Sequence, residues 1–287
     1  ETLIPDDSEK IEAVYEEDAA KEENSKELML LVEDNQELRE FLRSIFTPMY
    51  RVVEAADGRE GANKALKYLP DIIISDVMMP EKDGIEMVRE LREEMNTSHI
   101  PIVMLTAKST IESRIEGMKS GADDYITKPF SAAYLKARIF NLVDQRKKLQ
   151  ALFCASLLPT ATSQQTNYEK EEAQPSLSAN DQKFIDKVME TIEKHLDNGD
   201  LMVEDIANEV NMSRSVFFKK LKTLTGLSPV EFLREIRMKR AAQLIETDEY
   251  NMAQIAYMVG LNDSHYFSKC FKQQYGMTPT EYKESRK

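Results

Sequence analysis

The sequence predicts an α/β domain built on a doubly wound, five-stranded parallel sheet, followed by an all-α domain with two helix-turn-helix motifs. Short apolar runs alternate with helix-like stretches over residues 28–148, a pattern typical of a parallel sheet covered on both faces by helices. After residue 181 the chain keeps a helical pattern without strand-like alternation. A segment at 206–232 is repeated in weaker form at 255–282.

The elements of the first domain follow in a regular order of five strand-and-helix units. Ile72, Ile73 and Ile74 form an apolar run typical of a strand that is buried on both faces. The expected strands are Leu28–Val32, Tyr50–Val53, Ile72–Asp76, Ile102–Leu105 and Tyr125–Ile126. The expected helices are Gln36–Phe46, Glu60–Tyr68, Ile85–Glu94, a helix from Thr110, and Ala132–Lys148.

Charged and hydroxyl side chains stand where these strands end. Glu33 and Asp34 follow the first strand, Asp76 ends the third, and Thr106 and Lys128 follow the fourth and fifth. Because the carboxyl ends of parallel strands share one edge of the sheet, we expect these residues to lie close together. Clustered carboxylates repel one another unless a cation such as Mg²⁺ neutralises them. A Lys and a Thr hydroxyl beside them suit a phosphoryl group.

Length and composition limit the possible classes of protein. The 287 residues suffice for two domains, and the hydrophobic fraction of 41% is ordinary for a globular chain. No stretch approaches the roughly 18 apolar residues that span a bilayer, so no membrane contact is expected. The isolated Cys154 and Cys270 favour a reducing cytoplasm, and the three histidines lack metal-ligand spacing. The start at Glu1 suggests a piece of a longer protein, which could be tethered to a membrane elsewhere.

The net charge of −13 is unevenly distributed along the chain. Residues 1–27 hold eleven Asp or Glu against three Lys or Arg and are expected to be an acidic lead-in. Residues 149–180, rich in Ser, Thr, Gln and Pro, are expected to be a flexible linker. Residues 211–287 hold thirteen Lys or Arg against eight Asp or Glu. This basic end is compatible with a nucleic acid partner.

Each copy of the repeat contains a short helix, a tight turn and a longer amphipathic helix, with Ser213 and Asn262 as the expected caps. Apolar stripes predict the core-facing sides of the longer helices, and the opposite sides carry residues that can contact phosphates and base edges. The core stripes are Phe217, Leu221 and Leu224 in the first copy, and Phe267 and Phe271 in the second. The DNA-facing candidates are Arg214, Ser215, Phe218, Lys219 and Lys222, then His265, Ser268, Lys269 and Lys272.

Residues 28–147 resemble a CheY-type receiver domain of two-component signalling, which has a flavodoxin-like fold. The matching motifs are VEDN at 32–35, SDVMMPEKDG at 75–84, LTAKS at 105–109 and GADDYITKPF at 121–130. The resemblance implies that Asp76 accepts a phosphoryl group and that Mg²⁺ binds Glu33, Asp34, Asp76 and the backbone carbonyl of Met78. It further implies that Thr106 and Tyr125 are switch residues, that Lys128 contacts the phosphoryl group, and that Lys128-Pro129 is a cis peptide.

Residues 181–287 resemble an AraC/XylS-type DNA-binding domain. The match rests on DIANEVNMSRSVFFKKLKTLTGLSP, IRMKRAAQLI and QIAYMVGLNDSHYFSKCFKQQYGMTPTEY. The resemblance implies double-stranded DNA as partner, with two recognition helices in successive turns of the major groove, about 34 Å apart. Phe218 departs from the polar residues frequent at such a position, although it could touch a thymine methyl.

The order of the two domains resembles the C-terminal part of hybrid two-component proteins of Bacteroidetes. This implies a transcription regulator that is not itself an enzyme and that receives its phosphoryl group from a histidine kinase. In the resembled proteins the kinase lies upstream in the same polypeptide. Because the linker is long and polar, phosphorylation is expected to act by pairing two receivers through residues 109–147, with release of an inhibitory contact as the alternative. Two other functions stay open. One is a DNA-binding protein whose unphosphorylated receiver only dimerises. The other is a Mg²⁺-dependent phosphatase, which would need an acid where Met78 stands.

Overall fold

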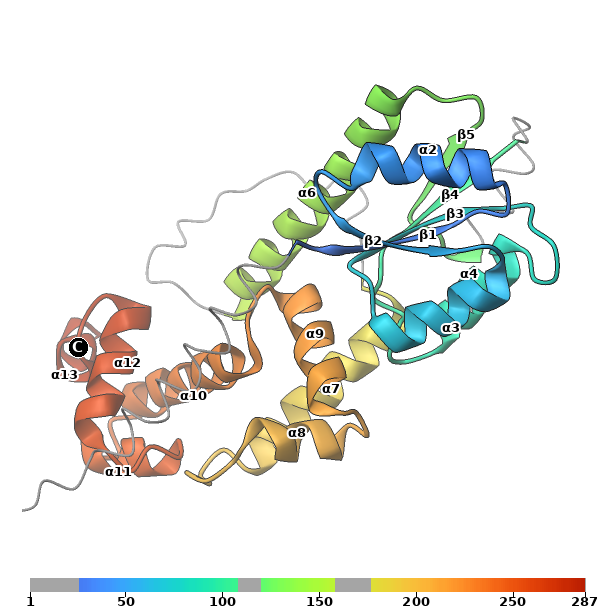
Figure 1. The fold of residues 1–287 in the computed structure, drawn as a ribbon. Helices are drawn as coiled ribbons and strands as arrows, with labels where there is room; N and C mark the ends of the chain where they lie inside the picture. The colour runs from blue at the N-terminus through green and yellow to red at the C-terminus, as the bar shows by residue number, and fades with distance from the viewer. Residues whose placement is uncertain (1–25, 108–119, 158–176, 287) are drawn as a thin grey trace, which may run out of the picture. The chain divides into compact units, whose positions relative to one another are not determined.

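The computed structural model describes residues 26–107, 120–157 and 177–286. Within them the chain forms two compact units (Figure 1). The first unit comprises the residues up to Arg89 together with Ile100–Ala132, and the second comprises Glu90–His99 together with the residues from Ala133 onward. The sequence predicted a different division, into residues 28–148 and 181–287. In the structure, Glu90–His99 and the helix that begins at residue 132 group with the C-terminal helices.

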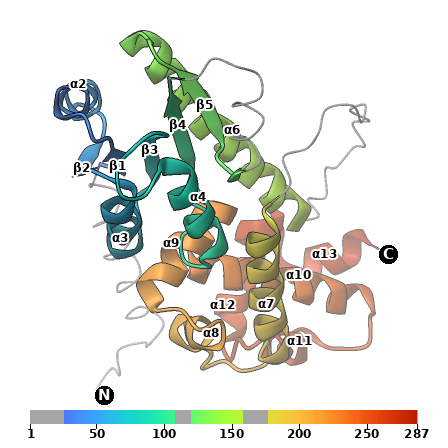
Figure 2. The same ribbon diagram turned by 90° about the vertical axis from the view of Figure 1, so that its right-hand side faces the viewer.

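The first unit is built on a five-stranded parallel sheet, as the sequence predicts. Its strands follow one another in the order β2-β1-β3-β4-β5 (Figure 2). Because the first strand lies inside the sheet, the chain winds first to one side and then to the other, which is the doubly wound topology. The strands are β1 (Leu28–Val32), β2 (Arg51–Ala55), β3 (Ile72–Asp76), β4 (Ile102–Thr106) and β5 (Asp124–Thr127).

Helices cover both faces of this sheet: α2 (Gln36–Phe46) lies on one face and α3 (Gly58–Tyr68) on the other (Figure 1). Helix α2 has the predicted bounds, whereas α3 begins two residues before the predicted start because Asp57 caps it. The Asp57 carboxylate accepts hydrogen bonds from the backbone amides of Arg59 and Glu60, at 2.8 and 2.9 Å. Helix α4 (Gly84–Glu93) begins in the first unit and ends in the second. The predicted helix from Thr110 falls largely outside the described residues.

Helix α6 (Ala132–Leu157) is longer than predicted, so the linker prediction of 149–180 is wrong at its beginning. Residues 149–157 read LQALFCASL, and they contain neither Gly nor Pro, so nothing in them ends a helix. The linker prediction is also two residues too long at its end, because helix α7 (Ala179–Lys194) starts after its cap Ser178. The rest of the linker lies mostly outside the described residues.

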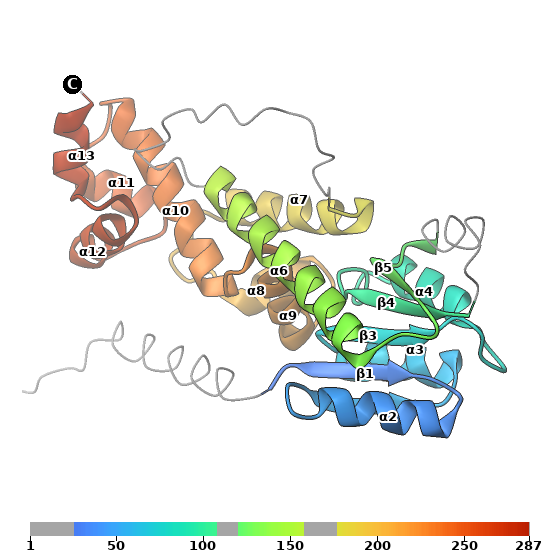
Figure 3. The same cartoon turned by 90° about the horizontal axis from the view of Figure 1, so that it is seen from above.

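The C-terminal part is helical throughout and contains the two predicted helix-turn-helix motifs. Helix α10 connects the group α7–α9 with the group α11–α13 (Figure 3). Each group buries its own apolar cluster. Among the described residues, every helix is too short or too polar to span a bilayer. The helices after α7 are α8 (Val203–Glu209), α9 (Arg214–Thr225), α10 (Pro229–Glu246), α11 (Met252–Met258), α12 (Ser264–Tyr275) and α13 (Pro279–Ser285).

The repeat is visible in the caps of the two longer helices. The Ser213 side chain caps α9 as predicted, but α12 is capped by Asp263 and not by the expected Asn262. The Asp263 carboxylate accepts the amides of residues 265 and 266, at 2.7 and 3.3 Å, and Asn262 stands one residue too early to do so. Both helices end at a glycine in the left-handed region, Gly226 (φ 78°) and Gly276 (φ 75°).

Candidate functional site

The carboxyl ends of two neighbouring strands bring together the acids that the sequence singled out. Glu33 and Asp34 follow β1, and Asp76 is the last residue of the neighbouring strand β3. One carboxylate oxygen from each residue lies within 4.8 Å of the other two. Glu33 and Asp76 are buried, whereas Asp34 is exposed. Such a cluster is unstable without a positive charge.

Lys128 supplies a positive charge to this cluster. Its Nζ lies 2.9 Å from Glu33 Oε2 and 3.1 Å from Asp76 Oδ2. The loop after β5 is held close by the Lys128 amide, which donates to the Thr106 carbonyl at 2.7 Å. The Lys128–Pro129 peptide is cis, as expected. We call Glu33, Asp34, Asp76 and Lys128 the acidic site.

The two carboxylate oxygens of Asp76 have different surroundings. Oδ1 accepts a hydrogen bond from the Val77 amide at 2.8 Å, which fixes the side-chain rotation. Oδ2 faces Lys128. The side chain is 11% exposed, so the strand end leaves a small part of it accessible. This combination of fixed orientation and a neighbouring cation suits a carboxylate that acts as a nucleophile.

Glu33 is almost fully enclosed, with 1% of its side chain exposed. Burial raises the pKa of Glu33 above its ordinary value, and the charge of Asp76 adds to the rise, while the hydrogen bond from Lys128 opposes it. Arg39, which the sequence reasoning missed, donates to the Glu33 carbonyl at 2.5 Å and to the Asp34 carbonyl at 3.4 Å. Its position one helical turn into α2 was the available signal, because a side chain there points back toward the acidic loop.

The remaining candidate residues of the first unit are Thr106, Tyr125 and Met78. Thr106, at the end of β4, is 5% exposed. The Tyr125 hydroxyl, on β5, lies 2.8 Å from Ser120 Oγ in a hydrogen bond that the sequence did not suggest. The Met78 side chain is 59% exposed and leaves only its backbone as a candidate ligand.

The acidic site fits a hard divalent cation. Three carboxylates converge, one of them exposed, and oxygen ligands of this kind are those that Mg²⁺ prefers while keeping some of its water. Lys128 places an ammonium group beside these carboxylates, and a phosphoryl oxygen is a suitable partner for such a group.

Gly84, the first residue of α4, packs directly on the backbone of Asp76. A Cβ at this position would lie 2.1 Å from the Asp76 carbonyl oxygen and 2.6 Å from Met104 Cε. We therefore expect Gly84→Ala to displace the strand end, to cost about 1–3 kcal/mol of unfolding free energy and to weaken Mg²⁺ binding. Urea unfolding and Mg²⁺ titration measure these effects. Adding Met104→Ala should not restore either property, and a rescue would show that the side-chain contact dominates.

The predicted core stripes of the helix-turn-helix motifs are confirmed. Phe217, Leu221, Phe267 and Phe271 are each at most 1% exposed, and Leu224 is 8% exposed. The candidates for DNA contact lie mainly on the accessible sides of α9 and α12, with Phe218, Lys219 and Ser268 half-buried. We call them the first reading face (Arg214, Ser215, Phe218, Lys219, Lys222) and the second reading face (His265, Ser268, Lys269, Lys272).

Contacts within the reading faces restrain some of these side chains. Arg214 Nε lies 2.9 Å from Glu204 Oε1, and both side chains are about half exposed. Lys222 Nζ lies 5.7 Å from the centre of the Phe218 ring, so the two side chains form a cation–π contact. Ser268 Oγ donates to the Ser264 carbonyl within α12. Exposed ion pairs are weak, and a phosphate can replace the carboxylate partner of Arg214.

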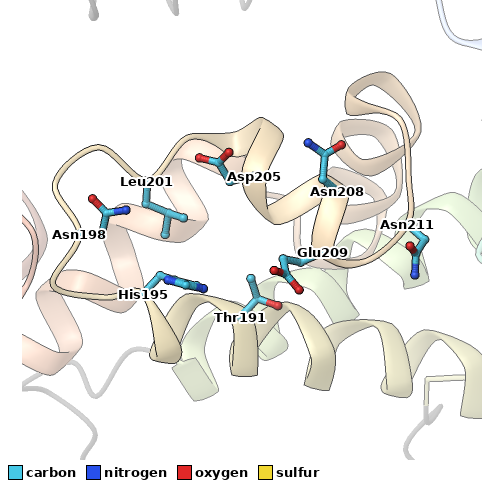
Figure 4. Close-up of a pocket in the computed structure, with 8 residues that line it drawn as sticks. All are labelled: Thr191, His195, Asn198, Leu201, Asp205, Asn208, Glu209 and Asn211. Atoms are coloured by element: carbon cyan, nitrogen blue, oxygen red, sulfur yellow. The ribbon is translucent and has the colours of Figure 1, made fainter.

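A polar cavity of about 470 Å³ lies between α7 and α8 (Figure 4). None of the candidate site residues lines it. One of its acids, Asp205, already accepts the Met202 amide at 2.9 Å as part of the α8 cap. Its lining is Thr191, His195, Asn198, Leu201, Asp205, Asn208, Glu209 and Asn211.

Comparisons with known proteins match both parts of the chain. A model of the response regulator receiver domain matches residues 29–140, and a model of a helix-turn-helix domain matches residues 206–285. Histidine kinase P4 of Formosa agariphila is 37% identical over 260 residues, which are 91% of this chain and 18% of that protein. The probable transcriptional regulator ycf27 of Guillardia theta is 42% identical over 40% of this chain and 44% of its own length. This chain thus spans less than half of either relative.

Among solved structures, the receiver domain of a sensor histidine kinase from Pseudomonas aeruginosa is 31% identical, with a TM-score of 0.39. The match covers 41% of this chain and 98% of that one, whose structure is described with a magnesium ion coordinated in its active site cleft.

Proposed function

We propose that this chain, which carries a response regulator receiver domain and an AraC-type helix-turn-helix domain, is a transcription regulator whose DNA binding is controlled by phosphorylation of Asp76. The observation that carries the proposal is the acidic site, where three carboxylates and Lys128 meet at the end of β3. The phosphoryl donor would be a histidine kinase, which we place either in a separate protein or in a longer form of this polypeptide.

The chemistry proposed for Asp76 is a phosphoryl transfer. The accessible oxygen of its carboxylate attacks phosphorus, an O–P bond forms, and the N–P bond to the kinase histidine breaks. Bound Mg²⁺ would supply charge neutralisation for the phosphoryl oxygens, with Glu33, Asp34, Asp76 and the Met78 carbonyl as its proposed ligands. The Lys128 ammonium, which already faces Asp76 Oδ2, stabilises the negative charge that accumulates on the phosphoryl group. We propose that the Thr106 hydroxyl moves toward the phosphoryl group and that the Tyr125 side chain rotates in response.

The two reading faces are proposed to contact double-stranded DNA in successive turns of the major groove, which are about 34 Å apart. Lys and Arg there would meet phosphates and guanine edges, and Ser and His would meet base edges. We propose that the chain acts in the cytoplasm, where such a regulator meets DNA, and that phosphorylated receivers pair. The pairing surface predicted at 109–147 includes α6, on which Tyr134 and Phe140 are 51% and 71% exposed, and residues outside the described ranges.

One experiment tests the proposed function. The chain is incubated with acetyl phosphate and Mg²⁺, its intact mass is measured, and the same sample is used to enrich duplexes from a random DNA library. We expect the mass to rise by one phosphoryl group and the modified chain to bind the enriched duplex more tightly than the unmodified chain does. Footprints should show two protected segments one helical turn apart. A chain that binds the duplex but never gains mass would favour a receiver that only dimerises.

A further inference from the structure

Lys220 is a buried charge in a position where the helical repeat calls for a core residue. Superposing the two motifs by their caps and terminal glycines pairs Lys220 on α9 with Cys270 on α12. Both are buried, with 0% and 4% of their surface exposed. A fully buried lysine is rare and depends on partners for its charge. The second motif fills the position with a small apolar side chain, so the first motif needs the lysine for something other than packing.

The partners of Lys220 come from two places in the chain. Its Nζ lies 2.9 Å from Asp181 Oδ1 on α7, and it also donates to the Met95 carbonyl at 2.6 Å and to Ser98 Oγ at 2.9 Å. These three acceptors use all three ammonium protons. Two of them belong to residues 92–99, which lie in the receiver part of the sequence but in the second compact unit. We call residues 92–99 the docking segment.

Asp181 and Ser98 complete the cluster. Ser98 Oγ accepts from Lys220 and donates to Asp181 Oδ1 at 2.7 Å, so the three side chains form a closed set of hydrogen bonds. Burial alone would raise the pKa of Asp181, but Lys220 and Ser98 hold it below its ordinary value. The Lys220 ammonium also lies 4.9 Å from the centre of the Phe184 ring. The pair is therefore buried and satisfied only while the docking segment is in place.

Two further hydrogen bonds hold the docking segment against the helices of the second unit. Asn180 Nδ2, on α7, donates to the Arg92 carbonyl at 2.9 Å. Arg146, on α6, donates to the His99 carbonyl. His99 itself is 2% exposed. Burial lowers its pKa to about 3, and the charge of Lys220 contributes, so this imidazole is neutral at neutral pH.

The docking segment contacts α9, the helix that carries the first reading face. Lys219 is half-buried, whereas its counterpart Lys269 in the second motif is exposed. Its neighbour on α9, Lys220, donates to Met95 and Ser98 of the docking segment. A half-buried lysine is less available to DNA than an exposed one.

We propose that Lys220, Asp181 and Ser98 form a latch by which the docking segment holds the first helix-turn-helix motif in a state of low DNA affinity, and that phosphorylation of Asp76 opens it. This inference rests on the proposed function. Helix α4 supplies the connection, because its first residue, Gly84, donates to the Val77 carbonyl next to Asp76 at 2.9 Å. The last turn of the same helix leads into the docking segment. The signal then needs no rigid linker.

The test compares full-length variants in binding to the enriched duplex, without phosphorylation. Ser98 lies outside the DNA-binding motif. Ser98→Ala removes the hydroxyl that accepts a hydrogen bond from Lys220 and donates one to Asp181. Lys220→Met replaces the charge by an apolar side chain, as Cys270 does in the second motif. Each should raise DNA affinity about tenfold, the effect of losing one or two net hydrogen bonds. Beryllofluoride with Mg²⁺, a phosphoryl mimic, should then add little further affinity.

Two matched controls accompany these variants. Ser44→Ala removes an exposed hydroxyl that donates only within α2, and it should change nothing. Lys222→Met removes an exposed charge from the same helix as Lys220 and should weaken binding with and without the mimic. Amide hydrogen exchange gives a readout independent of DNA: α9 and residues 92–99 should exchange faster in both latch variants and in the wild-type chain with beryllofluoride.

The outcomes separate this inference from the proposed function. If Ser98→Ala and Lys220→Met leave affinity and exchange unchanged while the wild-type chain gains a phosphoryl group, the latch is refuted and the proposed function stands. If the chain takes up no phosphoryl group but both variants still bind DNA more tightly, the latch exists and its control by Asp76 is refuted.

Discussion

Asp76→Asn abolishes phosphoryl uptake: after incubation with acetyl phosphate and Mg²⁺, we expect the intact mass of the variant to be unchanged. The amide has nearly the shape of the carboxylate, and its oxygen can still accept the Val77 amide that now binds Asp76 Oδ1 at 2.8 Å. It lacks the anionic oxygen that attacks phosphorus. The loss should therefore be complete while circular dichroism shows the wild-type fold.

Asp83→Asn is the matched control for this variant. Asp83 lies in the same loop and accepts the Glu86 amide at 2.8 Å at the start of α4, outside the acidic site. We expect it to gain mass like the wild-type chain. A phosphoryl mass on Asp76→Asn, or its loss in Asp83→Asn, would show that the phosphoacceptor has been assigned to the wrong residue.

The second large effect concerns the stability of the acidic site without metal. In EDTA, Lys128→Met should lower the free energy of unfolding by about 3–5 kcal/mol, the usual cost of removing one partner from a buried ion pair. Glu33 and Asp76, with 1% and 11% of their side chains exposed, would face each other and Asp34 without the cation that now pairs with both. Urea unfolding measures the loss.

Adding Mg²⁺ should recover much of this stability, because a divalent cation neutralises the same carboxylates. Lys148→Met provides the comparison: Lys148 pairs with Asp144 at 2.8 Å, but its side chain is 73% exposed, and such a pair contributes well under about 1 kcal/mol. Equal losses for the two variants, or a loss for Lys128→Met that Mg²⁺ does not reduce, would contradict this account of the acidic site.

The sequence predicted the sheet and the approach of its acidic residues because both follow from local patterns. Runs such as Ile72–Ile74 mark buried strands, and the rule that ligands bind at the carboxyl ends of parallel strands needs no knowledge of packing. Local patterns also set the error at α6. The polar composition after residue 158 is typical of a linker, but residues 149–157 contain nothing that ends a helix and belong to α6.

The residue type of Lys220 does not predict its burial, although its position on the helix does indicate the core. Lys220 lies three residues after Phe217 and four before Leu224, on the core side of α9, and the repeat pairs it with Cys270. Its acceptors in the docking segment are more than 120 residues away in sequence, and no local pattern announces such a pairing. The hydrogen bond between Ser120 and Tyr125 joins residues only five apart, but it depends on the turn between them, which no motif in the sequence announces.

The burial of whole strands has a consequence for the chain before it folds. Strands β1 and β3 read LMLLV and IIISD, and every one of their residues is buried in the sheet. In an unfolded chain, short apolar segments of this kind pair with copies of themselves and start aggregates. Charges at the ends of such segments oppose this self-association. Glu33, Asp34 and Asp76 stand at those ends, so the carboxylates of the acidic site also oppose aggregation while the polypeptide is being synthesised.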